Sequence, residues 1–384
     1  MRRTWAIALV AAAVVLAALG PRIRVGWLAA RLLYETARPF EASSPARLRA
    51  EPLVQVIELE VGHAVVVADL YRPPGRGPHP GILLVHGMAD AGRSDERLTR
   101  FADALARAGY VVLVPDLEGL RRFRVSLDDV GTIVSAFEHL RSAPGVRTDR
   151  VAMFGASYSG ALALLAAADP AIADGVRFCF LLGAYHDLRN VIVFMTTGHY
   201  RVDGQWARLE PENFGRWVFL LNVDDVVESP SDRETLERIA LAKLADPDAD
   251  VFSLVGRLGA EGRRVFDIIT ATDPDAAVAL LDELPERASE YLARLSPKGS
   301  MASVKARLIL VHGRDDNMIP YTESLALAEE APAGTRTRLE LLGSFRHVDL
   351  IVEPDGGVHS LARAAAEILA LYSIAWDIVA EGRL

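Results

Sequence analysis

The stretch FGASYSG, residues 154–160, follows a short apolar run at 151–154 and precedes a segment rich in alanine and leucine. A serine on a tight turn between a strand and a helix projects its hydroxyl above the sheet, and its flanking residues must be small because neighbouring backbone lies close to them. Gly155 and Ser159 stand two residues before and after Ser157. The pattern favours Ser157 as a nucleophile, with Ser159 as the alternative in a second register. A serine that only caps a helix would look the same locally.

Short apolar runs alternate with helical segments on both sides of this turn. Continuous apolar runs are typical of strands buried on both faces. They are found at 81–85, 110–115, 151–154, 178–182, 306–311 and 337–342, after two strands at 54–61 and 64–71 that join near Gly62 and His63. Helical spacing is found at 98–108, 126–141, 159–168 and from 360 onward. This alternation predicts an α/β fold with a mainly parallel, doubly wound sheet.

The alternation stops between residues 186 and 300. There the sequence predicts helices joined by polar turns, at 211–226, 231–245, 265–270, 273–284 and 285–295. Ser231 and Glu234 have the spacing of a capping box. Residues 51–185 and 301–384 together have the size of one α/β domain. We therefore interpret 186–300 as a helical lid inserted after a strand, where a lid over an active site would lie.

A serine hydroxyl alone is a weak nucleophile, so Ser157 needs a histidine base, a carboxylate and donors for an oxyanion. Met88 follows a buried strand and a glycine, and Tyr158 follows Ser157 directly. The backbone N–H groups of Met88 and Tyr158 are the expected oxyanion donors. His86, at the end of the same strand, is interpreted as a residue that packs a loop.

The carboxylate is expected in the segment VHGRDDNMIP, residues 311–320. Asp316 lies three residues after Gly313 and four before Pro320, so it is preferred to Asp315.

The base is expected after the last strand. His347 lies in a glycine-containing loop that follows the run 337–342. His359 also follows this strand, but it stands just before the terminal helix and is interpreted as a cap or surface residue. Asp349, two residues from His347, is a further possible acid.

Four short motifs in this order resemble one known family: DLYRP (69–73), HGM (86–88), GASYSG (155–160) and HGRDDNMIP (312–320). The chain resembles the α/β-hydrolase superfamily, in particular its branch near dienelactone hydrolases and prolyl-oligopeptidase-type catalytic domains. The resemblance covers about 51–185 and 301–384. It implies an α/β-hydrolase fold and a triad of Ser157, Asp316 and His347, in agreement with the residues taken by themselves.

We therefore expect a serine hydrolase that cleaves a carboxylic ester or a related acyl compound through an acyl-enzyme, with no metal and no organic cofactor. A serine peptidase, an acyltransferase and a non-catalytic membrane-tethered scaffold are the alternatives. Six aromatic residues of the lid either form its own core or line an apolar acyl pocket: Phe194, Tyr200, Trp206, Phe214, Trp217 and Phe219.

The N-terminal part, residues 1–50, is expected to contain a hydrophobic anchor followed by a linker. Trp5 to Gly20 carries no charge over sixteen residues. As a helix it would span about 24 Å, a little less than a hydrocarbon core of about 30 Å. Pro21 follows the best candidate cleavage site, Ala18 to Gly20, which disfavours removal. The segment predicts membrane association through residues 5–20, with export after signal cleavage as the alternative.

Composition excludes some classes of partner and site. The net charge of −9 argues against binding to nucleic acid. The single cysteine, Cys179, excludes an intramolecular disulfide and a cysteine-based zinc site. A lid above a membrane-tethered site suggests a small-molecule or lipid-like acyl substrate.

Overall fold

The computed structural model describes residues 2–37, 51–62, 64–343, 345–347, 349–350 and 358–383. Residues 38–50, the last part of the segment 1–50 that was expected to hold the anchor and linker, lie outside the described residues. Eight strands form one sheet in the order β1-β2-β4-β3-β5-β6-β9-β10. Their bounds are β1 (Leu53–Val61), β2 (Ala64–Arg72), β3 (His79–Val85), β4 (Val111–Pro115), β5 (Val146–Ala156), β6 (Val176–Leu182), β9 (Arg307–Gly313) and β10 (Thr337–Leu342).

The sheet is parallel from β4 through β10, and β2 pairs antiparallel with both β1 and β4. The predicted doubly wound, mostly parallel sheet is therefore confirmed. Side chains of β3 alternate between two apolar layers, because successive residues of a strand point to opposite faces. Leu83 and Val85 pack with α4 (Leu127–Ser142) and α5 (Tyr158–Ala167). Ile82 and Leu84 pack on the other face.

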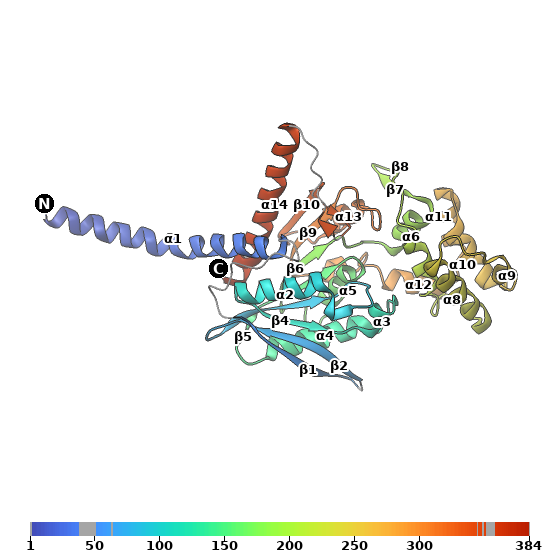
Figure 1. Cartoon of the computed structure of the whole chain (residues 1–384), viewed down its shortest axis with the longest axis horizontal. Helices are drawn as coiled ribbons and strands as arrows, with labels where there is room; N and C mark the ends of the chain where they lie inside the picture. The colour runs from blue at the N-terminus through green and yellow to red at the C-terminus, as the bar shows by residue number, and fades with distance from the viewer. Residues whose placement is uncertain are drawn as a thin grey trace.

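Three helices cover that other face: α1 (Arg2–Ala37), α2 (Glu96–Ala108) and α14 (Val358–Arg383). Figure 1 shows α1 crossing beside α14. Gly26 permits this approach, since a Cβ there would lie 2.9 Å from the ring of Trp376 and 3.0 Å from the hydroxyl of Tyr372. Within the part of the chain that the structure describes, no helix combines the length and apolar character needed to span a membrane.

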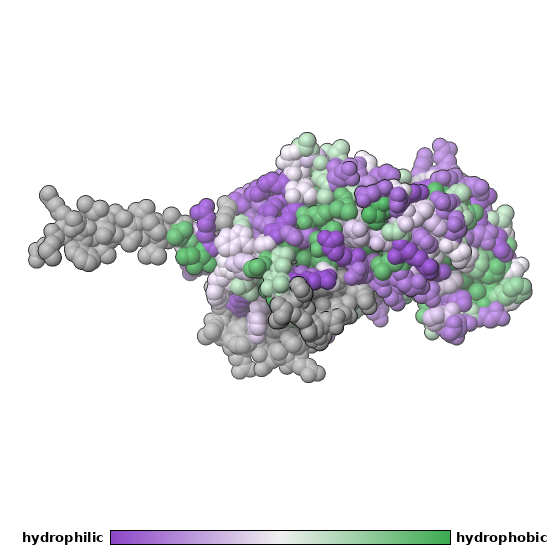
Figure 2. Space-filling model, turned by 90° about the horizontal axis from the view of Figure 1, so that it is seen from above, coloured by the Kyte–Doolittle hydropathy of each residue, from purple (hydrophilic) through white to green (hydrophobic). Residues whose placement is uncertain are grey.

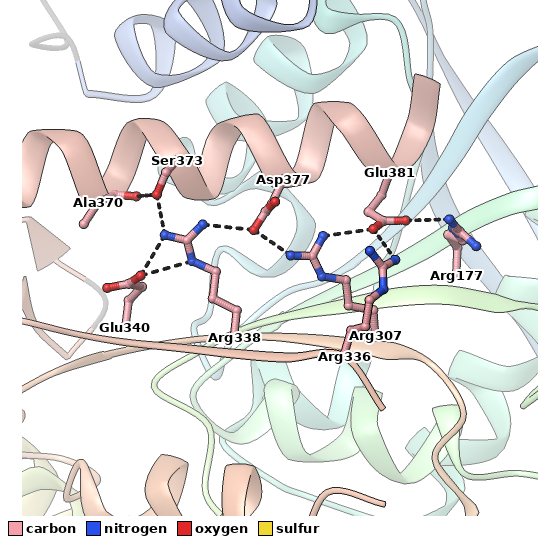
Figure 3. A network of polar contacts seen from close by, with 9 residues as sticks. All are labelled: Arg177, Arg307, Arg336, Arg338, Glu340, Ala370, Ser373, Asp377 and Glu381. Atoms are coloured by element: carbon pink, nitrogen blue, oxygen red, sulfur yellow. Dashed lines mark hydrogen bonds and ion pairs between the residues drawn. The ribbon is translucent and has the colours of Figure 1, made fainter. Parts of the chain in front are cut away.

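Ion pairs hold α14 on the sheet (Figure 3). Arg307 of β9 bonds to both Asp377 and Glu381, at 2.6 Å and 2.9 Å. Arg338 of β10 reaches Asp377 at 2.9 Å. Arg336 and Arg177 also contact Glu381, which is almost fully buried. The C-terminal half of α14 is thus fixed against β6, β9 and β10.

Between β6 and β9 the chain forms a helical insertion, which lies at the end of the molecule opposite the N-terminus of α1 (Figure 1). It contains α6 (Leu188–Thr197), β7 (His199–Val202), β8 (Gln205–Arg208), α7 (Phe214–Leu220), α8 (Pro230–Ala245), α9 (Phe252–Val255), α10 (Ala260–Thr270), α11 (Pro274–Asp282) and α12 (Glu286–Arg294). The β7–β8 hairpin was not expected from the sequence. The helix predicted at 211–226 is shorter, since α7 covers only Phe214–Leu220.

The capping box predicted at Ser231 and Glu234 is wrong. The helix begins one residue earlier, at Pro230, and Ser229 is its N-cap, with a side chain that accepts from the backbone N–H of Asp232. Proline suits the first position of a helix because its missing N–H would have no partner there. Pro230 therefore sets the start of the helix, and Ser231 falls inside its first turn.

Candidate active site

Ser157 stands on a tight turn between β5 and α5. Its φ of 58° and ψ of −131° are a backbone conformation that non-glycine residues rarely adopt. The backbone N–H of Ser157 donates to the carbonyl of Leu182, the last residue of β6, at 2.8 Å, which joins the turn to the neighbouring strand. A Cβ on Gly155 would lie 2.5 Å from the carbonyl oxygen of Ser159 and 2.7 Å from the Cα of Gly160. Close packing of backbone thus forces a small residue at 155 and holds Ser157 in its strained conformation.

Ser159, the alternative nucleophile, is fully buried. Its Oγ accepts from the N–H of Ala156 at 3.0 Å and lies 2.8 Å and 3.0 Å from the carbonyls of Ala156 and Val85. The hydroxyl therefore ties the turn to the end of β3. Its small size and its bonds explain why serine can replace the usual glycine at this position.

His347 and Asp316 lie in contact. The Nδ1 atom of His347 is 3.1 Å from Oδ2 and 3.2 Å from Oδ1 of Asp316. Asp316 follows β9 and is 1% exposed, and its Oδ1 also accepts from the backbone N–H groups of Met318 and Ile319 at 2.8 Å and 2.9 Å. A carboxylate that accepts these bonds keeps its own orientation and that of the imidazole.

His312 is a further residue of this cluster, and the sequence reasoning did not single it out. Its Nε2 lies 2.9 Å from the carbonyl oxygen of Ile319 and 3.3 Å from Oδ2 of Asp316. A carbonyl only accepts, so Nε2 carries a proton, and Nδ1 is left to accept from the hydroxyl of Ser324 at 2.7 Å. Its place at the end of a buried strand, in the motif HGRDD, was the sequence signal that could have identified it.

The surroundings of Asp316 favour its ionised form. Burial alone would raise the pKa of this carboxyl. The charge of His347 and the hydrogen bonds from His312 and His347 outweigh burial and hold the pKa well below its usual range. Asp316 is therefore a carboxylate throughout the neutral range.

Gly183, at the end of β6, completes the cluster and was also missed. Its φ is +61°, and a Cβ there would lie 3.3 Å from Oδ2 of Asp316 and 3.8 Å from Nδ1 of His347. Only glycine combines the left-handed backbone with this close approach.

A cavity of about 670 Å³ is lined by two of these groups, Ser157 and His347. Its lining includes Ser157, His347, Met88 and Gly87. Three of the five predicted site residues, Ser157, His347 and Met88, therefore line the same cavity. Tyr158 begins α5, where the first backbone N–H groups have no partner inside the helix. The side chain of Tyr158 does not line the cavity and packs against Tyr185, with ring centroids 5.4 Å apart.

Other candidate residues lie apart from this chemistry. Asp315 is exposed. His86 also borders the cavity, but its Nε2 accepts from the N–H of Leu117 at 2.9 Å, and burial lowers its pKa, so it packs the loop as a neutral ring. The side chains of Asp349 and His359 lie outside the described residues. Among the residues that are described, no group of three or more His, Cys, Asp or Glu side chains is placed to hold a metal ion.

Of the six aromatic residues singled out in the insertion, only Phe214 lines the cavity. Trp217 is buried in the core shared with the insertion helices, and Trp206 and Phe219 pack against the same core. Phe194 is fully buried and stacks edge-on with Tyr200, at a centroid distance of 5.8 Å. Most of these rings therefore stabilise the insertion itself.

Comparison with known proteins identifies the family. Residues 82–371 match the model of the family described as "Alpha/beta hydrolase family". The chain belongs to this family. A search of the curated proteins finds no match. A hydrolase of this fold carries out its chemistry at the carboxyl ends of the strands, where Ser157, Asp316 and His347 stand.

Several solved structures are similar to this chain. An acylaminoacyl peptidase from Pyrococcus horikoshii shares 15% identity over 88% of this chain, with a TM-score of 0.52. A 2,6-dihydroxy-pseudo-oxynicotine hydrolase shares 18% identity over 87% of this chain and 70% of its own, with a TM-score of 0.47. A dienelactone hydrolase from Anabaena variabilis shares 17% over 83% and 97%, with a TM-score of 0.41. The chain spans 42% of the length of the peptidase. At these identities the likeness concerns the fold.

Proposed function

We propose that this hydrolase cleaves a carboxylic ester, or a related acyl compound, through an acyl-enzyme on Ser157. The observation that carries the proposal is one cavity lined by a serine in a strained turn and by a histidine whose other nitrogen contacts a buried carboxylate. A serine and a histidine that line one cavity, with a carboxylate behind the histidine, are what nucleophilic acyl transfer requires.

In the first half of the reaction, Ser157 Oγ attacks the acyl carbon and His347 Nε2 takes the hydroxyl proton. The oxyanion accepts from the backbone N–H groups of Met88 and Tyr158. His347 then returns the proton to the leaving oxygen, and an alcohol departs. In the second half, water attacks the acyl-enzyme, gives its proton to His347, and the proton passes to Ser157 as the acid leaves.

Asp316 supports both halves by accepting the Nδ1–H of His347, which leaves Nε2 as the base. Its low pKa also means that the imidazolium formed in each half faces a negative charge. His312 acts as a positioning residue: its Nε2–H points to the carboxylate and to the Ile319 carbonyl at the same time.

We propose further that residues 186–300 act as a lid domain over a core formed by 51–185 and 301–384. Supporting contacts join the insertion to the loop of Asp316: the N–H of Glu212 donates to the carbonyl of Asn317 at 2.8 Å. Phe214, from the same segment, lines the cavity. Movement of α7 would therefore change access to Ser157.

We also propose membrane association through residues 5–20, with the exported, cleaved form as the alternative. Helix α1 carries this apolar segment, and Leu19 near its end and Ile23 and Trp27 beyond it are largely exposed. Figure 2 shows apolar side chains on α1 beside its grey part. Trp27 at the end of such a segment fits the aromatic belt of a membrane interface. N-terminal sequencing of the membrane fraction tests this: a mature chain that starts after Gly20 would support the exported form.

The catalytic proposal is tested with a fluorophosphonate probe and p-nitrophenyl acetate. We expect the wild-type protein to be labelled and to release p-nitrophenol, and Ser157→Ala to do neither. Ser159→Ala is the matched control and should keep labelling. Turnover by Ser157→Ala together with its loss in Ser159→Ala would assign the nucleophile to Ser159, and absence of labelling in the wild type would favour a scaffold. Added alcohol or amine acceptors, with product analysis, distinguish hydrolysis from acyl transfer.

A further inference from the structure

The cavity that contains Ser157 continues along one face of the sheet, away from the helical insertion. Its wall there is formed by one face each of α1, α2 and α14. On α14 the lining residues are Leu371, Ile374, Ala375 and Ile378, which repeat at the spacing of a single helix face. We call this part of the cavity the chamber.

The lining residues of the chamber follow two elements, β5 and α14. Phe154 of β5 lines it three residues before Ser157, which follows the end of this strand, so the two residues lie up to about 10 Å apart along the chain. The lining of α14 extends from Leu371 to Ile378, a rise of about 10 Å along a helix. The lining residues of β5 and α14 thus each extend over about 10 Å.

The walls of the chamber are mostly hydrocarbon. Phe101 of α2, Phe154 of β5 and Phe180 of β6 pack together, with ring centroids 5.1 Å, 5.3 Å and 6.2 Å apart. Leu32 and Leu33 of α1 and Val311 of β9 add to the lining. The charged lining residues on this side, Asp95, Arg97 and Arg100, all belong to the first turns of α2 and its cap. The interior of the chamber therefore has few hydrogen-bonding groups and a large apolar surface, which suits an apolar ligand.

We propose that the chamber binds a linear hydrocarbon chain of the substrate, so that the enzyme prefers esters with a medium or long chain. The inference rests on the proposed function, because Ser157 must react with the ester group at the mouth of the chamber. It differs from the expectation of an acyl pocket beneath the lid aromatics, since α1 and α14 supply the walls. An elongated apolar space that ends at the nucleophile fits an unbranched chain better than a peptide, whose amides would lose hydrogen bonds to water.

The experiment compares two substrate series below their critical micelle concentrations. One series lengthens the acyl group, from p-nitrophenyl acetate to the decanoate, and the other lengthens the alcohol, from ethyl to decyl acetate. Burial of each methylene should raise kcat/KM by about fourfold until the chamber is full. A rise in the first series places the chain on the acyl side, and a rise in the second places it on the alcohol side. Flat profiles in both series overturn the inference.

A variant that fills the chamber gives the second readout. Ala375→Leu adds bulk to a nearly buried lining position. If the acyl series responds in the wild type, we expect Ala375→Leu to lower the ratio of kcat/KM for the octanoate to that for the acetate at least tenfold. If the alcohol series responds, the same loss is expected in the ratio for octyl acetate to that for ethyl acetate. Ala364→Leu, at an exposed position of the same helix, is the matched control and should keep the wild-type ratio. If Ala375→Leu does not fold, Leu371→Trp fills the chamber from a partly exposed position.

Binding separates this inference from the catalytic proposal. Ser157→Ala should still bind the fluorescent fatty acid cis-parinaric acid, and Ala375→Leu in that background should weaken binding at least tenfold. Binding of parinaric acid without serine-dependent turnover would contradict the proposed function but would support the chamber as a binding site for a hydrocarbon chain. Serine-dependent turnover with no chain-length preference and no parinaric acid binding would contradict the chamber and leave the function standing.

Discussion

Nδ1 of His347 lies 3.1 Å from Oδ2 of Asp316, although the two residues come from different loops, 31 positions apart. The contact exists because β9 and β10 are parallel neighbours, so the loops that follow them leave the sheet at the same edge. The backbone of His347 has a φ of 56°, which is uncommon for histidine. The pair is therefore held by the topology of the sheet and by a local turn that glycine would adopt more easily.

Loss of the charge on Asp316 should abolish most activity. In Asp316→Asn the amide cannot hold the Nδ1–H tautomer of His347 with the same strength, and we expect kcat to fall by about 10³–10⁴-fold, as in other serine hydrolases with this arrangement. Steady-state kinetics on p-nitrophenyl acetate measure it. The exposed neighbour gives the control: Asp315→Asn should keep wild-type kcat. Equal losses in both variants would mean that Asp315 serves the site.

The carboxylate of Asp316 should make the free energy of unfolding decrease at acidic pH. The pKa of Asp316 is depressed in the folded protein relative to about 3.9 in the unfolded chain. Its contribution to the free energy of unfolding is therefore fully present above about pH 4 and is lost as the pH falls toward the folded value. Urea titrations at pH 5, 4 and 3 should show a smaller acid loss in Asp316→Asn than in the wild type. An unchanged acid dependence would show that the ionised form is not favoured in the fold.

A methyl group at position 155 should disrupt the serine turn. The added Cβ would stand 2.5 Å from backbone oxygen of Ser159, so either the turn or α5 must shift. We expect Gly155→Ala to lose about 1–3 kcal/mol of stability and most of kcat. Gly131→Ala in α4 is the control, because nothing lies within 4 Å of its Cβ and alanine favours a helix. Wild-type activity in Gly155→Ala, measured beside thermal unfolding, would contradict this account of the turn.

Neutralising Glu381 should weaken the attachment of α14. Glu381 faces Arg177, Arg307 and Arg336, and it is almost fully buried. Glu381→Gln removes the negative charge that these three arginines face, and we expect a loss of about 3 kcal/mol in the free energy of unfolding. Glu329→Gln, at an exposed position on α13 (Thr322–Glu330), should cost less than about 0.5 kcal/mol. Denaturant unfolding of both variants gives the comparison.

Much of the sheet could be predicted because its strands are buried on both faces. Runs such as GILLV and YVVLVP are unambiguous, and Gly81 to Val85 lies inside β3 as expected. The insertion was less predictable, because its helices bury one face against each other and short polar turns set their ends. Ser229 and Ser231 show this: either serine could cap the helix, and Pro230 at its first position selects Ser229.

The candidate site was predictable where one residue type has a chemical role in a motif. Ser157, Asp316 and His347 were predicted in this way, and the structure brings His347 and Asp316 into contact. Gly183 was not found, because its importance comes from a close approach to Asp316 and His347 that no local pattern records. His312 was not singled out, although it stands in the motif HGRDD four residues before Asp316. The chamber could not be predicted either, since it is formed by helices at opposite ends of the sequence.

The contact between Gly26 and the rings of Tyr372 and Trp376 has a consequence for synthesis of the protein. Helix α1 (Arg2–Ala37) precedes α14 (Val358–Arg383) in the chain, so α1 leaves the ribosome well before its docking site has been made. Throughout translation Val25, Leu28 and Leu32, which are buried in the finished fold, have no α14 to cover them. Chaperones or a lipid surface would therefore meet this apolar face before the enzyme closes over it.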